Sequence, residues 1–393
     1  MKPQHFDHLL FLLVIALMGI GLIMVYSASS ITSLTEMADS SFYFKRQLLW
    51  VCLGLLALLG FANLDYRKLE YLAIPLLVLS FAALVVVLIP GVAREIGGAK
   101  RWIRFGAFGF QPSELAKLAV VIYLSHSIST RQEQIQNLVR GVLPDMLLMG
   151  VIFVLILKEP NLSTAAILAS VYFILLFLGN GSLLHLGLMG ISGITLVVSL
   201  VFQEGYRMRR FLAFMDPWGS ARTSGYHIIQ SMIAIGSGGI WGLGLGQSRQ
   251  KFHILPERHT DFIFAIICEE IGLIGGIAVI VLFLLLIWRG FYIANRAPDT
   301  FGFLLGSGIT SIIACQVLIN LGVVLSLMPT TGITLPFVSY GGSSLIFLAA
   351  SVGILLSISR FGGGKNAFQD SRRKPFSSRF SNFSKKLFAR QNS

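Results

Sequence analysis

A polar segment that runs directly into an apolar helix contains the strongest candidate for a functional site in this sequence. The stretch 255–276 reads LPERHTDFIFAIICEEIGLIGG, and Asp261 lies at the junction of its polar and apolar parts. A carboxylate at the mouth of a membrane helix is costly to keep there, so it indicates a functional site. The alternative is that Asp261 only caps the helix, because a carboxylate is favoured at the N-terminal end of the helix dipole. This stretch alone supports both interpretations equally.

The helix that follows Asp261 has one face made almost only of small side chains. At helical spacing this face carries Ala265, Cys268, Gly272 and either Gly275 or Gly276. Small residues let the backbones of membrane helices approach closely. We therefore expect another helix to pack against this face.

Two segments outside the long apolar runs carry clusters of Arg and Lys. The first cluster contains Lys100, Arg101 and Arg104, and the second, in the long connection 204–261, includes Arg258. Guanidinium and ammonium groups bind phosphate oxygens well. These cations predict that an anionic ligand is bound on their side of the molecule.

A few polar residues lie inside the apolar runs. Glu114 and Lys117 are three residues apart, so they share a helix face and can pair; a structural ion pair and a functional role both fit them. Glu269 and Glu270 lie about two turns into their helix, and a structural hydrogen bond to a neighbouring helix is favoured there over catalysis. Ser339 belongs to a segment rich in small and hydroxyl residues, where close packing is favoured over a cavity lined by hydroxyls.

The composition predicts an integral membrane protein. Of the 393 residues, 55% are hydrophobic and only 12% are charged, and the mean hydropathy is +0.77. Soluble domains contain about twice that share of charged residues. The three cysteines lie within apolar runs and no His or Cys spacing is typical of a metal site, so neither disulfides nor zinc are expected.

Ten apolar runs approach the ~20 residues that are needed to cross a bilayer. They lie near 8–29, 47–63, 70–90, 113–129, 141–158, 162–180, 183–203, 262–288, 301–327 and 337–359. An even number of spans puts both termini on one side, and the basic tail beside the last run indicates that this side is cytoplasmic. Counted with this tail, 16 Lys and Arg fall on the cytoplasmic side and 14 on the outer side, so the positive-inside rule gives only weak support. The expected fold class is an all-α integral membrane protein with ten transmembrane helices and both termini in the cytoplasm.

We expect one membrane domain, 1–360, followed by a basic, disordered cytoplasmic tail, 361–393. Eight Lys and Arg and a single acid lie in this tail, which suits an anionic membrane surface better than a nucleic acid. Between the seventh and eighth spans, 204–261 is expected to form a long extracytoplasmic loop. Loops of this length are usually functional, and its glycine-broken part 228–246 is expected to be re-entrant or interfacial.

Four long motifs, in order along the chain, resemble those of the SEDS proteins (shape, elongation, division, sporulation). They are GAKRWIRFGAFGFQPSELAKL, GYHIIQSMIAIGSGGIWGLGLGQSRQKFHILPE, LPERHTDFIFAIICEEIGLIGG and MPTTGITLPFVSYGGSSL. The resemblance extends from Tyr26 to the last apolar run. The segments FMDPW, QSRQK and TTGITLPF are similar to the cell-division branch (FtsW) rather than the elongation branch (RodA).

The resemblance implies a peptidoglycan glycosyltransferase of the bacterial cytoplasmic membrane that acts at the division septum. Its substrate would be lipid II, and the growing glycan would move from its lipid diphosphate to the 4-hydroxyl of an incoming lipid II on the extracytoplasmic side. Matching the motif makes Asp261 the catalytic base, which accepts the hydroxyl proton. The expected substrate-binding residues are Lys100, Arg101, Arg104, Glu114, Lys117, Arg258, His259 and Ser339. No resident metal is predicted, although a divalent cation such as Mg²⁺ is compatible with the diphosphate chemistry.

The same resemblance implies a class B penicillin-binding transpeptidase as a partner, with other division proteins and membrane lipids. Two other classes of function remain open at this point, a lipid II flippase and a non-catalytic division scaffold. One departure concerns the connection after the fifth run, where the family usually has Pro-Asp-x-Gly-Thr. Here the residues are Pro160-Asn161-Leu162-Ser163-Thr164, which puts a role of this connection in substrate or cation handling in doubt.

Overall fold

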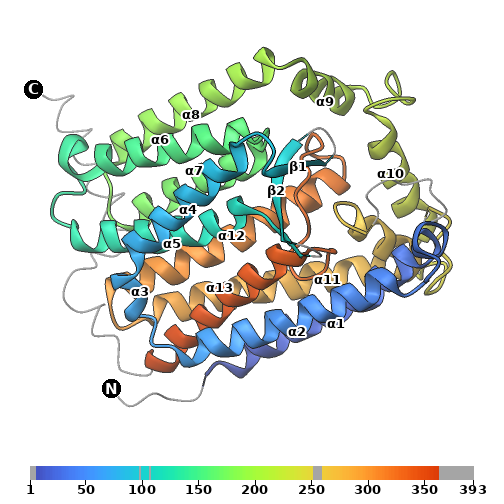
Figure 1. Cartoon of the computed structure of the whole chain (residues 1–393), viewed down its shortest axis with the longest axis horizontal. Helices are drawn as coiled ribbons and strands as arrows, with labels where there is room; N and C mark the ends of the chain where they lie inside the picture. The colour runs from blue at the N-terminus through green and yellow to red at the C-terminus, as the bar shows by residue number, and fades with distance from the viewer. Residues whose placement is uncertain (1–5, 97–98, 106–107, 251–258, 363–393) are drawn as a thin grey trace, which may run out of the picture.

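The computed structural model describes residues 6–96, 99–105, 108–250 and 259–362, and it is mostly helical (Figure 1). The first half contains α1 (His8–Met37), α2 (Phe42–Asn63), α3 (Lys68–Tyr71), α4 (Ala73–Leu88), α5 (Pro112–Thr130), η1 (Leu138–Val142), α6 (Leu143–Lys158) and α7 (Leu162–Leu178). The second half contains α8 (Leu183–Gln203), α9 (Gly205–Met215), α10 (Tyr226–Gly238), α11 (Ile263–Asn295), α12 (Thr300–Val324) and α13 (Gly342–Phe361). The basic tail from residue 363 onward lies outside the described residues, as does Arg258.

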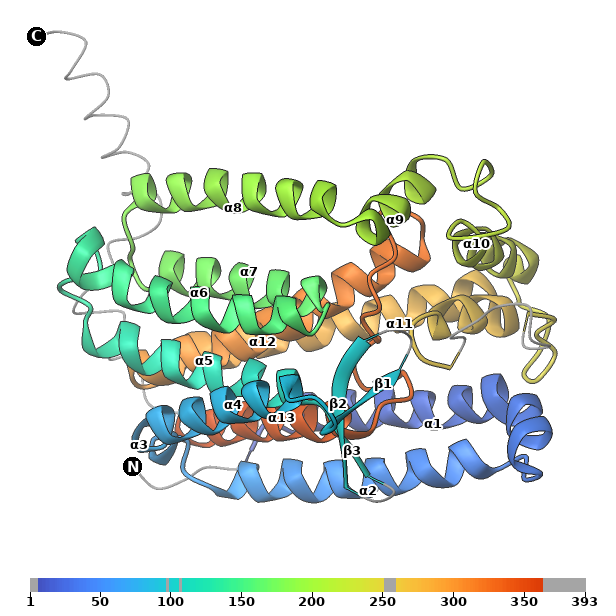
Figure 2. The same cartoon turned by 45° about the horizontal axis from the view of Figure 1, so that its top comes forward.

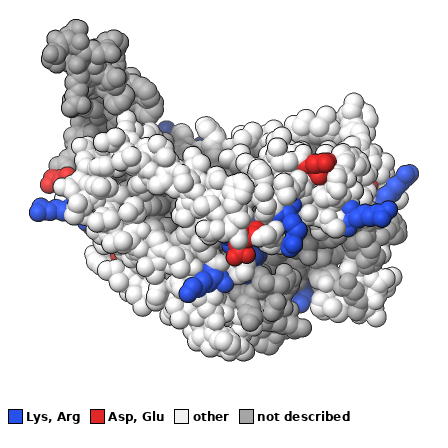
Figure 3. Space-filling view, turned by 90° about the horizontal axis from the view of Figure 1, so that it is seen from above, with Lys and Arg blue, Asp and Glu red and all other residues white. Residues whose placement is uncertain are grey.

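Each of the ten predicted apolar runs coincides with a helix, namely α1, α2, α4 to α8 and α11 to α13. Within the described part of the chain, seven helices are long and apolar enough to cross a membrane, and α4 and α7 are shorter apolar helices. The surface is also that of a membrane protein. Figure 3 shows a face with few charged side chains. Most side chains of the apolar helix α8 are exposed at the edge of the bundle (Figure 2). The protein is therefore a multi-pass membrane protein.

The prediction that the fold is entirely α-helical is wrong for the segment between α4 and α5. This segment forms an antiparallel sheet of β1 (Ala93–Ile96), β2 (Ala99–Phe105) and β3 (Phe108–Phe110), in the order β1-β2-β3. β2 is the central strand, so both of its edges are paired within the sheet. The central strand AKRWIRF contains Trp102, Ile103 and Phe105, which are aromatic and β-branched residues that suit a strand.

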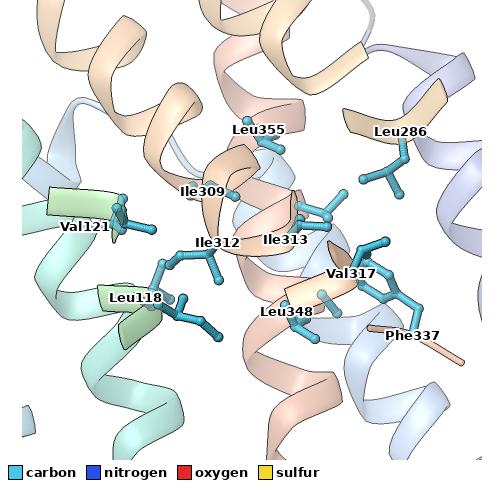
Figure 4. Packing of buried hydrophobic residues seen from close by; sticks show 14 of the residues in the cluster. Leu118, Val121, Leu286, Ile309, Ile312, Ile313, Val317, Phe337, Leu348 and Leu355 are labelled. Atoms are coloured by element: carbon cyan, nitrogen blue, oxygen red, sulfur yellow. The ribbon is translucent and has the colours of Figure 1, made fainter. Parts of the chain in front are cut away.

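Helix α12 lies at the centre of the bundle and contacts α5, α7, α10, α11 and α13. Figure 4 shows its isoleucines packed between side chains of α5, α11 and α13. Small residues allow the close approach that membrane helices need. At Gly290 of α11, for example, an added Cβ would lie 2.5 Å from the Thr310 hydroxyl of α12. The closely packed helices at this centre hold the loops at either end of the bundle in position.

The two ends of the described chain lie together at one end of the bundle. The backbone N–H of Asp7 donates to the Ser359 hydroxyl (3.1 Å), and the Asp7 carboxylate forms an ion pair with Arg289 (2.6 Å). Nearby connections are also bound to one another, because the Tyr66 hydroxyl donates to the Asp299 carboxylate (2.5 Å). The small sheet and α9 lie toward the opposite end (Figure 1).

The long connection 204–261 contains two helices, α9 and α10, which the sequence did not delimit. Helix α10 has 13 residues, about 20 Å, which is short of the ~30 Å hydrocarbon thickness. This agrees with the prediction that the segment does not span the bilayer. After α10 the chain turns back along α11, where the N–H groups of Leu243 and Gly244 donate to the carbonyls of Glu269 and Glu270 (3.0 and 2.9 Å).

The small face of α11 packs against the helix α10, as expected, because an added Cβ at Gly238 of α10 would overlap the Cys268 carbonyl; it also packs against the returning turn. An added Cβ at Gly272 would lie 2.4 Å from both the Gly242 nitrogen and the Ile240 oxygen. Gly272 also has φ +78°, which interrupts the helical backbone and is a conformation that favours glycine. The glycine is thus required both for its φ and for the close approach of backbone to backbone.

Candidate active site

Asp261 lies at the entrance to α11, one residue before the N-cap residue Phe262. Its carboxylate faces the segment that precedes α13, because an added Cβ at Gly332 would lie 3.7 Å from the Asp261 Oδ2. Gly332 itself has φ +80°. The side chain is partly exposed, whereas Phe262 and Ile263 that follow are buried. Asp261 is therefore a carboxylate at the boundary between the buried bundle and its surface.

The backbone around Asp261 is bound to the segment 333–340 and to α12. Its carbonyl accepts a hydrogen bond from the Asn320 side-chain amide (2.8 Å), and the Thr260 carbonyl accepts one from the Ser339 hydroxyl (2.6 Å). Ser339 is 4% exposed, and its hydroxyl also accepts from the backbone N–H of Leu335 (2.9 Å). The packing interpretation of Ser339 thus agrees with where its hydroxyl lies.

Arg101 of β2 joins several elements at this end of the molecule. Its Nε donates to the Glu159 carbonyl (2.9 Å), and an Nη2 hydrogen is donated to the Pro160 carbonyl. Burial lowers the pKa of Arg101, and the charges that act on it include the Asp261 carboxylate and the Arg210 guanidinium. The charges of the expected site residues Arg101 and Asp261 therefore act on each other.

Arg210 was not among the candidates from the sequence, yet the structure brings it to Arg101. Its guanidinium lies 4.4 Å from the centre of the Tyr206 ring, and its Nη1 donates to the Thr330 carbonyl (3.0 Å). Tyr206 and Arg210 are four residues apart in GYRMRRFLAFM, so one face of α9 carries both. That spacing was the available signal, but nothing in the sequence indicated that the charge of Arg210 would act on Arg101.

Glu159, in the connection between α6 and α7, is a second residue that was not among the expected site residues. It is 0% exposed, and neither carboxylate oxygen has a hydrogen-bond partner among the described residues. Burial raises the pKa of Glu159 to about 8, against the opposing effect of Arg101. This connection is thus more than a plain turn, because it holds a buried acid directly behind Arg101.

The other expected site residues occupy several positions. Glu114 and Lys117 form the predicted ion pair (2.8 Å), and both are buried at the start of α5. The His259 ring lies 5.0 Å from the ring of Tyr43 and 5.7 Å from that of Tyr340. The side chains of Lys100 and Arg104, and the whole of Arg258, lie outside the described residues.

Glu269 and Glu270 have the structural role that was favoured for them. The Ser27 hydroxyl of α1 donates to both oxygens of Glu270 (2.6 and 2.8 Å). Glu269 accepts from the Ser248 hydroxyl and from the backbone N–H of Arg249 (2.9 Å). These two carboxylates bind the returning segment and α1 to α11. In the described part of the chain, no three acidic, His or Cys side chains converge into a group that could hold a metal ion.

Replacing Glu159 with Gln is expected to change how stability depends on pH. Because burial raises the pKa of Glu159 to about 8, the folded chain keeps a proton that the unfolded chain releases above about pH 4.5, so stability falls as the pH rises from about 5 to about 8. The Gln variant lacks this loss. It should match the parent near pH 5 and unfold roughly 2–4 °C higher or more near pH 8.5, measured by thermal unfolding in detergent. Glu204, an exposed acid, is the control for Glu→Gln replacement; parallel pH curves for parent and Glu159→Gln would contradict the prediction.

Comparison with known proteins covers nearly the whole chain. The family model described as "Cell cycle protein" for FtsW, RodA and SpoVE matches residues 7–363. The chain is 44% identical to Stage V sporulation protein E of Bacillus subtilis over 92% of this chain and 98% of that protein. It is 42% identical to the probable peptidoglycan glycosyltransferase FtsW of Trichlorobacter lovleyi over 91% of this chain and 94% of that protein.

Solved structures are also similar in fold. Thermus thermophilus rod shape determining protein RodA superposes with a TM-score of 0.67 at 30% identity, covering 91% of this chain and 98% of that one. A chain from a structure described as "Structural coordination of polymerization and crosslinking by a peptidoglycan synthase complex" superposes with a TM-score of 0.76 at 31% identity, with the same coverage. On the strength of the family match and of these relatives, the chain belongs to the FtsW/RodA/SpoVE family of cell cycle proteins.

Proposed function

We propose that this chain is a peptidoglycan glycosyltransferase that polymerises glycan strands from lipid II, with Asp261 as its catalytic base. The relatives named peptidoglycan glycosyltransferases support the enzyme class. The observation that carries the assignment of the site is that the segment 330–332 contacts both groups: Arg210 donates to the Thr330 carbonyl (3.0 Å), and Gly332 faces the Asp261 carboxylate. The charges of both groups also act on Arg101. A proton acceptor and two permanent cations in one place suit a reaction in which a hydroxyl attacks and a diphosphate leaves.

Asp261 acts on the attacking group. The 4-hydroxyl oxygen of the acceptor lipid II forms a bond to the anomeric carbon of the donor sugar, while the bond from that carbon to the diphosphate oxygen breaks. The hydroxyl proton passes to the Asp261 carboxylate, because a sugar hydroxyl is a poor nucleophile until its proton is drawn away. The electron pair of the broken bond leaves with the undecaprenyl diphosphate.

Arg101 and Arg210 stabilise that departing charge. Each guanidinium is fixed by donation to backbone carbonyls, so the cations are held in place before the reaction begins. Among the described residues no acceptor contacts Nη1 of Arg101, or Nε and Nη2 of Arg210. Two like charges held close together repel each other, and a diphosphate between them converts that repulsion into attraction.

The remaining expected residues take supporting roles in this proposal. Lys100, Arg104 and Arg258 add cations around the diphosphate. Lys117, paired with Glu114, brings a further cation to the start of α5. His259 and Ser339 act on substrate through the segment that leads to Asp261. A divalent cation such as Mg²⁺ would accompany the lipid diphosphate as its counterion, and no step of the proposal requires it.

The proposed topology has ten spans with both termini in the cytoplasm and Asp261 on the extracytoplasmic side. Helices α4, α5 and α7 are counted as spans although they are short or more polar; at 1.5 Å per residue, the 16 residues of α4 extend about 24 Å. The shared end of the two termini supports an even number of crossings. We place the protein at the division septum, with a class B penicillin-binding transpeptidase and other division proteins as partners, and with the basic tail on the lipid surface.

The proposal is tested by separating polymerisation from transport. The purified chain, alone and with its cognate transpeptidase, is incubated with labelled lipid II, and glycan strands are resolved by gel electrophoresis. In parallel, the chain in sealed vesicles is assayed for movement of labelled lipid II between leaflets. We expect strands without transport. Transport without strands would instead identify a flippase. The absence of both activities would indicate a non-catalytic scaffold.

A further inference from the structure

Three consecutive backbone carbonyls that end at Asp261 are each bound from the rigid side of the bundle. The donors all belong to α12 or to the segment that precedes α13, and they are the Tyr340 N–H to the His259 carbonyl (2.9 Å), the Ser339 hydroxyl to the Thr260 carbonyl (2.6 Å) and the Asn320 amide to the Asp261 carbonyl (2.8 Å). No turn of regular secondary structure supplies these bonds. The position of Asp261 thus depends on two side chains far away in the sequence.

Asn320 makes the most informative of these contacts. Its side-chain nitrogen also donates to the Ile333 carbonyl (2.7 Å), so both of its N–H groups are used. Ile333 follows Gly332, whose backbone faces the Asp261 carboxylate. One amide therefore connects the backbone that carries the carboxylate with the backbone that the carboxylate faces.

The surroundings of Asn320 make this connection stiff. Asn320 is 1% exposed and lies in the last two turns of α12, the central helix. In such a buried setting a hydrogen bond is strong and a missing one is costly. Neither an ionised Asp nor a Leu of similar size at this position can donate to the two carbonyls. The contact therefore depends on the amide and not merely on the volume of the side chain.

We propose that Asn320 is a positioning residue for glycosyl transfer, which with Ser339 holds the Asp261 backbone so that the carboxylate meets the attacking hydroxyl. This inference rests on the proposed function of Asp261 as the base. Asn320 does not touch the reacting atoms in this arrangement. Its effect is on where the base lies, and a displacement of about 1 Å is enough to slow a reaction about 10²-fold.

The test compares Asn320→Leu and Asn320→Asp with the parent in polymerisation of lipid II by the purified chain. We expect kcat to fall about 10–100-fold, while KM and the direct binding of lipid II stay within about twofold of the parent values. Gln316→Leu is the matched control, because Gln316 is an amide one turn earlier in α12 and is 3% exposed. No hydrogen bond in the described part of the chain joins Gln316 to 259–261. The kcat of the Gln316→Leu variant should therefore remain near that of the parent.

A second variant keeps the inference open to refutation if Asn320→Leu does not fold. Ser339→Ala removes the bond to the Thr260 carbonyl and should also lower kcat without raising KM. In addition, Asn320→Leu combined with Asp261→Glu should cost less than the two single effects multiplied, since both act through one carboxylate. Parent kcat in folded Asn320→Leu, or in Ser339→Ala if the former is not recovered, would overturn the inference. Parent activity in Asp261→Asn would instead overturn the assignment of the base.

Discussion

The Asp261→Asn variant is expected to lose about 10²–10⁴-fold in kcat for glycan formation while it still binds lipid II. Asn has nearly the same size and can make similar hydrogen bonds, but its amide oxygen cannot take a proton from the acceptor hydroxyl. The contacts of the Asp261 backbone with Asn320 do not involve the carboxylate, so the fold should be retained. The expected signature is therefore a loss in kcat with KM little changed.

Asp261→Glu separates the chemical role from the geometric one. It keeps a carboxylate but moves it by one methylene, toward a boundary that is already close to Gly332. We expect activity between that of the parent and that of the Asn variant. Rates are measured from strand yield over time at saturating lipid II. A Glu variant as inactive as Asn would still fit a strict geometric requirement, whereas an Asn variant more active than Glu would contradict the assignment of a base.

The second large effect is expected from the two guanidiniums. Arg101→Ala and Arg210→Ala should each lower kcat/KM about 10²-fold, and the double variant should lose more, because preorganised charges around a leaving group contribute strongly to the rate. Unlike Asp261→Asn, these variants should also raise KM, since the diphosphate is charged before the reaction as well as during it. Lys at either position should restore only part of the loss, because ammonium lacks the planar fork of N–H donors.

Arg209 is the matched control for this pair. It lies next to Arg210 on α9 and is exposed, and, unlike Arg210, it is not among the leading charges that act on Arg101. Arg209→Ala should therefore leave kcat/KM near that of the parent at moderate ionic strength, where charges at a distance are screened. Equal losses of kcat/KM in Arg209→Ala and Arg210→Ala would contradict a specific diphosphate site and would indicate a general effect of positive charge.

The helical architecture could be predicted because the bilayer imposes a simple rule on sequence. Each apolar run long enough to cross the hydrocarbon became a helix, and Glu114 and Lys117 form the pair that their spacing indicated. The sheet at 93–110 was missed because its strands are short and include charged residues and glycines. Strand pairing depends on partners that hydropathy does not reveal.

The candidate site was predictable only in part, because most of its contacts join segments that are distant in the sequence. A lone acid at the start of an apolar helix is visible in the sequence, and so Asp261 could be singled out. Arg210 could not be separated from its neighbours Arg207 and Arg209, because only the folded position of α9 brings it to Arg101. Asn320 carries no signal at all in an apolar run, since its importance comes from two carbonyls that reach it from other segments.

Formation of the first glycosidic bond between two lipid II molecules tests the central claim most directly. Parent and Asp261→Asn, each folded and each shown to bind lipid II with equal affinity, are mixed with labelled lipid II in rapid-quench experiments, and the tetrasaccharide product is measured over time. The proposed chemistry predicts that the variant forms this bond about 10²–10⁴ times more slowly at unchanged occupancy. Equal rates of bond formation in the two proteins would contradict it.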